Sequence, residues 1–157
     1  MYKFTISTKG KNDIIDMTPQ IDKFIKKSKI KEGICLISSP GSTCGITTIE
    51  YEPNLIEDFK EFLEKLAPSD KDYRHDKTWP ARLAPARLRF AEGKSGRSQR
   101  EAGGGEKNGQ SHILSALIKP FLIVPIDDGK LLLGQWQQIV FIDFDSRPRE
   151  RTIIVKI

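Results

Sequence analysis

The sequence predicts an α+β fold, a sandwich in which a mostly antiparallel sheet packs under two main helices. Apolar residues make up 38% of the 157 residues, which is enough to bury one core and favours a single domain over residues 1–157. Strand-like segments cluster in both halves of the chain, and only two segments show a clear helical period. This segregation of strands favours α+β over an alternating α/β sheet.

The first elements are predicted to be two strands followed by a helix. Aromatic and aliphatic residues alternate with polar ones over residues 1–8, the period-two pattern of a half-buried strand. The turn "KGKND" leads to a second short strand at 13–18. Thr18-Pro19 is a favourable helix start because Thr can cap the first amides and Pro fits the first helical position, and this helix is expected to end near Ser28.

The middle of the chain is predicted to hold a hairpin and the second helix. Residues 33–39 and 45–52 are rich in β-branched residues and are separated by a Pro-Gly turn, so they could pair as a hairpin. From Pro53 to about Leu66, apolar residues recur on one face and acidic residues on the other. This segment is the clearest helix in the sequence.

Beyond His112 the chain is predicted to be strand-like again. Turn signals separate the segments at Pro120, at "DDG" and at "SRPR". The segments expected to be extended are 112–118, 121–126, 130–145 and 151–157. The arginines at 147, 149 and 151 are typical of a solvated strand entrance, although an arginine there could also hold a phosphate.

A block at 80–105 differs in composition from the rest of the chain. It holds five of the seven alanines and five of the nine arginines, and it contains no Ile, Thr, Asn, Asp or Tyr. Its Gly-rich second half is polar enough to stay disordered, so the block is interpreted as an insertion. Six basic and two acidic residues in the block account for most of the net charge of +5. Outside it the basic excess is small, so nucleic acid is not the expected partner. The alternative is a nucleic-acid binder that uses the block itself.

Cysteine usage and hydropathy predict a cytoplasmic protein. Cys35 and Cys44 lack a CxxC spacing, and both are expected to be reduced thiols that pack in strands. The N-terminal residues lack the apolar core of a signal peptide. The apolar window at 121–126 is much shorter than the roughly 20 residues that a membrane helix needs, so no membrane partner is expected.

Several short motifs together resemble the secondary thiamine-phosphate synthase enzyme family. They are the Tyr-x-His of Tyr73 and His75, the Ser-His of Ser111 and His112, and the "LGQWQ" of residues 133–137. The segment "GSTCGITTIEYEP" at 41–53 also lies where that family has a Thr-rich strand ending in an acidic residue. Gly41 stands where many relatives have a histidine, and Gln135 where Thr is commoner. The likeness covers roughly residues 1–79 and 106–157.

The resemblance implies a homotrimer that joins a pyrimidine diphosphate to a thiazole phosphate, giving thiamine phosphate. Its expected partner is therefore a phosphorylated small molecule. The alternatives are a non-catalytic ligand-binding trimer and a nucleic-acid binder.

Two histidines and two acidic residues are the candidates for chemistry. Neutral imidazole binds divalent metals and moves protons near neutral pH, so His75 and His112 are predicted to be catalytic and to be metal ligands. Asp76 is predicted to complete a Mg²⁺ or Zn²⁺ site or to orient His75, and it could equally terminate a turn. Glu50 is a candidate base or metal ligand, although an exposed strand carboxylate is the commoner case.

Polar and aromatic residues elsewhere are the candidates for substrate binding. Hydroxyls around a Gly-containing turn can meet an anion, and a tryptophan can stack on a heterocycle whose edge a glutamine binds. Ordinary turn chemistry, or a tryptophan in the core, would explain the same residues. The predicted substrate-binding residues are Ser42, Thr43, Thr47, Asn108, Trp136 and Gln137.

Overall fold

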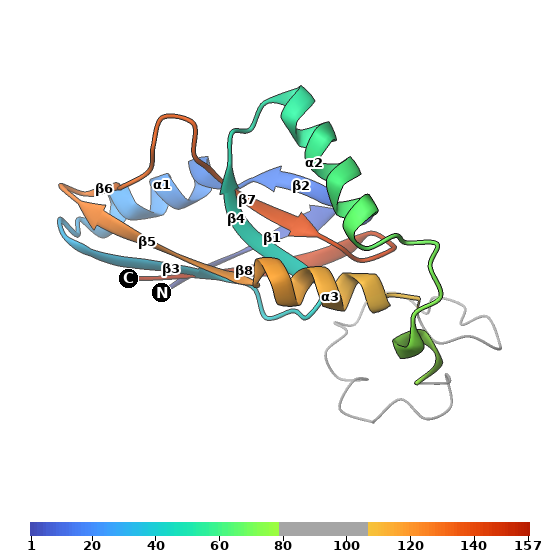
Figure 1. Ribbon diagram of the computed structural model, residues 1–157. Coiled ribbons are helices and arrows are strands. Elements are labelled where there is room, and N and C mark those ends of the chain that lie inside the picture. Colours follow the sequence, from blue (N-terminus) through green and yellow to red (C-terminus); the bar gives the residue numbers. More distant parts are fainter. Residues whose placement is uncertain (79–106) are drawn as a thin grey trace.

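Two antiparallel β-sheets and three α-helices make up residues 1–78 and 107–157, the parts of the chain that the computed structural model describes (Figure 1). Sheet A has the strand order β1-β8-β3-β5-β6, and sheet B has the order β2-β7-β4. The strands are β1 (Tyr2–Thr8), β2 (Asp13–Asp16), β3 (Gly33–Ser38), β4 (Cys44–Ile49), β5 (Phe121–Asp127), β6 (Lys130–Leu131), β7 (Gln138–Asp143) and β8 (Arg149–Lys156). The helices are α1 (Thr18–Ser28), α2 (Pro53–Leu66) and α3 (Gly109–Ile118), with a short 3-10 helix η1 (Arg74–Lys77). The predicted α+β class is confirmed.

The main core lies between sheet A and the layer formed by α1 and sheet B (Figure 1). The inward side chains of β3, β5 and β8 meet those of β4 and β7, because alternate residues of each strand point to the same face. Phe141 on β7 lies between Ile15 of β2 and Ile46 of β4 in the strand register and is fully buried. Ile21 and Ile25 close this core from α1.

A second core lies on the opposite face of sheet B, under α2 and α3 (Figure 1). Val140 and Ile142 alternate with Phe141 along β7 and therefore point to this face. Ile56 and Leu63 of α2 and Leu114 of α3 pack on them. Sheet B is buried on both faces, which explains the uninterrupted apolar run at 139–142 within β7.

The two predicted helices form at the predicted places. α2 begins as expected at Pro53, and Glu52 caps it by accepting the N–H groups of Asn54 and Leu55. These two hydrogen bonds lower the pKa of the Glu52 carboxyl. At α1 the cap differs from the prediction: Thr18 Oγ1 accepts the N–H of Ile139 at 2.8 Å and thereby ties the helix start to β7.

The predicted hairpin is wrong. β3 pairs with β5 and β8 in sheet A, whereas β4 pairs with β7 in sheet B. The Pro-Gly turn at 40 and 41 therefore carries the chain from one sheet to the other. The β-branched composition identified both strands correctly, but it carries no information on which strand each one pairs with.

The segment after residue 108 is a helix rather than the predicted strand. Gly109, Gln110, Ser111, Leu114 and Ser115 of α3 are all buried, whereas the apolar Ile113 and Leu117 are exposed, so the helix lacks a clean apolar stripe on its buried face. Ser115 Oγ donates to the carbonyl of Cys44 at 2.7 Å, and Ser111 Oγ donates to that of Phe144 at 2.5 Å. These hydroxyls fix α3 on sheet B.

The block at 80–105 lies outside the described residues. In the described part of the chain, no helix has the length and apolar character to cross a membrane.

Candidate functional site

His75 and His112 lie in direct ring contact. Their ring centroids are 4.6 Å apart and the ring planes are inclined at 65°, an edge-to-face arrangement. His75 comes from η1 and is exposed, and His112 comes from the first turn of α3 and is half-buried. The two histidines are separated by 36 residues in the sequence, and the fold brings them together at one surface.

Asp76 holds η1 on the N-terminus of α3. Its Oδ1 atom accepts the backbone N–H groups of Asn108 at 3.2 Å and of Gly109 at 2.9 Å. Asn108 itself makes no side-chain cap, so the carboxylate that satisfies these helix donors comes from a distant segment. Asn108 is buried, and its carbonyl accepts the N–H of His112 at 3.3 Å.

The other predicted residues lie along β4 and in the loop before β7, in two separate places. Thr43 and Ser42 precede β4, and Thr47 is half-buried within it. Glu50 follows the other end of the strand. β4 runs from Cys44 to Ile49, and at about 3.3 Å per residue its two ends are on the order of 17 Å apart.

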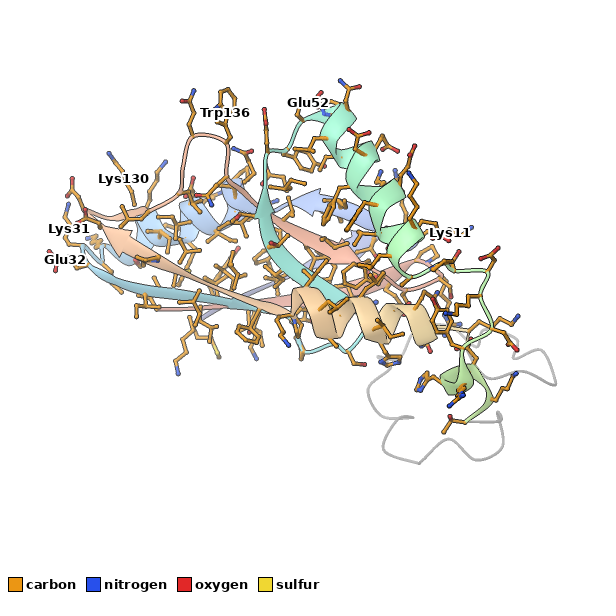
Figure 2. All side chains as sticks on the ribbon, viewed as in Figure 1. Lys11, Lys31, Glu32, Glu52, Lys130 and Trp136 are labelled. Carbon is orange, nitrogen blue, oxygen red and sulfur yellow. The ribbon has the colours of Figure 1, made fainter. Side chains whose placement is uncertain are left out.

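Trp136 and Gln137, in the loop before β7, lie near the C-terminal end of β4. Gln137 Nε2 donates to Thr48 Oγ1 at 3.4 Å, and Gln137 Oε1 accepts the N–H of Gly134 at 2.7 Å. Trp136 is 62% exposed at the tip of the loop between β6 and β7 (Figure 2). Within one chain, the structure therefore does not bring this loop to the histidine pair.

A buried charged cluster, which sequence reasoning missed, lies where β1, β4, β7 and β8 meet. Arg151 donates two hydrogen bonds to the fully buried Asp143, from Nε at 3.0 Å and from Nη2 at 2.5 Å. Arg149 Nε donates to Asp145 Oδ2 at 2.9 Å. Thr43 is buried beside this cluster, and its Oγ1 accepts from Arg151 Nη2 at 3.1 Å.

This cluster corrects the interpretation of Arg149 and Arg151 as part of a solvated strand entrance, whereas Arg147 is exposed as expected. Burial alone would lower the pKa of Arg151, but its hydrogen bond to Asp143 and the charge of that carboxylate raise it, so the guanidinium stays charged. Thr8 Oγ1 also donates to Asp143. The alternating aspartates of "DFD" at the end of β7 and the alternating arginines of "RPRER" at the start of β8 were the signal in the sequence that could have indicated this cluster.

The two cysteines are free and buried, in accordance with the packing role predicted for them. Burial raises the pKa of the Cys35 thiol to about 11. Burial also raises the pKa of Cys44, although Ser39 and Arg151 act in the opposite direction. Neither thiol is suited to attack as a thiolate at neutral pH.

A groove of about 680 Å³ runs along α1, away from the histidines. Asp16 and Asp22 line it together with three lysines and Gln138. None of the residues predicted for chemistry or substrate binding lines this groove.

The donor set around the histidines bears on the predicted metal. In residues 1–78 and 107–157 no group of three or more His, Cys, Asp or Glu side chains is arranged to hold a metal ion. The Oδ1 atom of Asp76 is committed to backbone amides. Two imidazoles suit zinc, whereas magnesium prefers oxygen ligands.

Two curled antiparallel sheets covered by helices, with an imidazole pair at the start of one helix, define a single-domain α+β protein. The chain belongs to the family described as UPF0047 protein YjbQ-like, whose model matches residues 2–157. A UPF0047 protein of Methanocaldococcus jannaschii is 34% identical over 100% of this chain and 93% of its own, and one of Archaeoglobus fulgidus is 31% identical over 98% of each.

Solved structures agree with this assignment. An uncharacterised YjbQ/UPF0047 protein of Clostridium acetobutylicum superposes with a TM-score of 0.75 at 26% identity, covering 100% of this chain and 99% of that one. A YbjQ-like protein of unknown function from Sulfolobus solfataricus, at 24% identity, shares the fold with a TM-score of 0.70, covering 99% and 97%.

These comparisons correct two predictions. The match is to the YjbQ-like UPF0047 family and not to a thiamine-phosphate synthase family, so both the predicted family and the predicted joining of pyrimidine and thiazole phosphates are wrong. Short motifs of this kind do not determine which reaction a site performs. The family match also runs across residues 80–105 and does not show that block to be an insertion.

Proposed function

We propose that this chain is an enzyme that acts on a small phosphorylated molecule by general acid–base catalysis at His75 and His112. The observation that carries the proposal is the ring contact of the two imidazoles, 4.6 Å between centroids. Imidazole takes up and releases protons near neutral pH, and a neighbouring pair allows one ring to accept a proton while the other donates one. Such a pair also provides donors for phosphate oxygens when protonated.

The surroundings of the pair support an anionic substrate. Arg74 and Lys77 flank His75 in η1, and Lys107 precedes the helix that carries His112. His75 is exposed and accessible to a ligand. If a divalent ion takes part, zinc held by the two imidazoles would leave other positions open to the substrate. Free thiols at Cys35 and Cys44 favour a reducing compartment, and we place the protein in the cytoplasm.

Replacing either histidine should abolish most of the activity. The probes are p-nitrophenyl phosphate, bis(p-nitrophenyl) phosphate and inorganic pyrophosphate, assayed from pH 5 to 9 with and without zinc. We expect turnover of at least one probe, with His75→Ala and His112→Ala each reducing it by about 100-fold or more, as for other general acids and bases.

Lys60→Ala is the matched control for that experiment. Lys60 pairs with Glu57 on α2, away from both histidines, so its removal should leave turnover unchanged. Circular dichroism would show that all variants are folded. Equal turnover in the wild-type protein and both histidine variants would contradict the acid–base roles, and the absence of turnover with all three probes would exclude these phosphoryl substrates.

We also propose that the chain forms a homotrimer through the outer face of sheet A. The register places Ile34 beside Pro125 and Leu36 beside Ile123 on this face. Ile34 and Ile123 are 61% and 56% exposed, and Phe121 continues the patch. Contiguous exposed apolar patches of this kind commonly mark protein interfaces.

Ile123→Asp should convert the assembly to monomers. The substituted carboxylate is solvated in the monomer but would be buried in the interface, where an unpaired charge is strongly unfavourable. Light scattering after size exclusion should give three times 17.8 kDa for the wild-type protein and 17.8 kDa for the variant. Phe62→Asp, at a similarly exposed position on α2, which covers the face of sheet B turned away from sheet A, is the control and should remain trimeric. A monomeric wild-type protein would contradict the proposal.

A further inference from the structure

We infer that Asp76 is a positioning residue, which sets the approach of His75 to His112 by capping α3 from η1, and that Gly109 permits this approach. The inference rests on the proposed function for its catalytic meaning. It assigns Asp76 a role that differs from that of a metal ligand. Asp76, Gly109, Asn108 and Tyr73 together are called the docking contact.

The cap is the polar half of the docking contact. One carboxylate oxygen of Asp76 accepts two consecutive N–H groups at the start of α3, at 3.2 and 2.9 Å. A negative charge at this position also interacts favourably with the positive end of the helix dipole. Asp76 directly follows His75, and His112 is hydrogen-bonded to the carbonyl of Asn108. His75 is therefore joined to the capping residue by a peptide bond, and His112 is joined by one hydrogen bond to Asn108, whose amide the cap accepts.

Close packing is the apolar half of the docking contact. A Cβ atom on Gly109 would lie 2.5 Å from Cβ and 2.8 Å from Cγ of Tyr73, and 3.2 Å from Asp76 Oδ1. Any side chain at residue 109 would therefore push η1 away from α3. Tyr73 is fixed in its turn because its hydroxyl donates to the carbonyl of Pro68 at 3.0 Å. Gly109 provides the space in which η1 and α3 meet.

The polar and apolar halves act on the same two segments. Loss of the carboxylate frees the first amides of α3, and addition of a methyl group at residue 109 forces the segments apart. Either change should separate the imidazoles without altering a histidine. Asp72, which pairs with Lys77 on the exposed side of this segment at 2.6 Å, should have no such effect.

The test is a nuclear Overhauser experiment on untagged protein labelled with ¹³C in histidine. Because His75 and His112 are the only histidines in the chain, each inter-ring signal has a single assignment. We expect this signal in the wild-type protein and in Asp72→Asn, and its loss in Asp76→Ala and in Gly109→Ala. Asp76→Asn keeps an oxygen acceptor for both amides and should retain the signal.

Turnover of the phosphoryl probes provides a second, separate measurement. Asp76→Ala and Gly109→Ala should each lower kcat at least tenfold and change the pH profile, whereas Asp76→Asn should stay within threefold of the wild-type protein. An inter-ring signal that persists in Asp76→Ala and Gly109→Ala would overturn the positioning role. If one of these two variants does not fold, the other still decides, because they disturb the contact by different means.

The two proposals can fail separately. If the inter-ring signal depends on Asp76 and Gly109 while the histidine variants keep full turnover, the positioning role stands and the proposed function is wrong. If the histidine variants lose turnover while Asp76→Ala keeps the signal, the function stands and the positioning role is wrong.

Discussion

Arg151→Ala is expected to lower the free energy of unfolding by about 3–5 kcal/mol, the range found when one partner of a buried ion pair is removed. Asp143 is completely buried, and Arg151 supplies two of the hydrogen bonds that its carboxylate accepts. Without the guanidinium this charge stays in the interior, where Thr8 and the amide of Asp145 still donate to it.

Urea denaturation followed by circular dichroism measures this loss. Lys31→Ala is the control, because Lys31 and Asp128 form an exposed ion pair at 3.3 Å, and its removal should cost no more than about 1 kcal/mol. Adding Asp143→Asn to Arg151→Ala should recover part of the stability, since the unpaired charge is then removed. A loss in Arg151→Ala no larger than in the control would contradict the structural role assigned to the cluster.

Phe141→Ala should lower the free energy of unfolding by a similar amount, about 3–5 kcal/mol. The ring is fully buried at the centre of sheet B, between two paired strands, and packs in the main core. Truncation would leave a cavity that three strands cannot close without breaking their register.

Phe62→Ala is the matched control for this second change. Phe62 is 57% exposed on α2, so the same chemical truncation should have an effect well below that of Phe141→Ala. Both proteins would be unfolded in urea under identical conditions, and their denaturation slopes compared to confirm that the same surface is exposed. Similar losses in the two variants would contradict the position of Phe141 in the core.

Local pattern predicted most of the secondary structure. β1 and α2 were found at their predicted places because each has one solvated and one buried face, which imposes a clear period on the sequence. α3 was missed because its polarity is reversed: Ile113 and Leu117 are exposed, whereas the buried face holds polar residues that bond to the backbone of neighbouring segments, so the apolar residues do not mark the buried face.

Strand pairing could not be predicted in the same way. β3 and β4 are neighbours in sequence with a turn between them, yet they belong to different sheets. The choice depends on β5, β7 and β8, which lie more than 70 residues later. Contacts at this sequence separation leave no local signal.

The candidate site was predicted in part. Residue chemistry singled out His75 and His112, and the structure brings them into contact. The sequence predicted Asp76 to serve the metal site or His75, or else to terminate a turn. Its observed role as the cap of a helix more than 30 residues away depends on tertiary contacts alone. The motifs grouped Trp136 and Gln137 with the histidines, but within a single chain these two residues lie near the other end of β4.

The position of β8 has a consequence for synthesis of the protein on the ribosome. β8 lies between β1 and β3, and Tyr2 pairs with Val155 in the register. Until β8 has emerged from the ribosome, β1 therefore lacks the strand that it pairs with in the described part of the chain. Such long-range pairing gives a high contact order, which slows folding. Sheet A is completed only after β8 has left the exit tunnel, and until then β1 and β3 lack the strand that joins them.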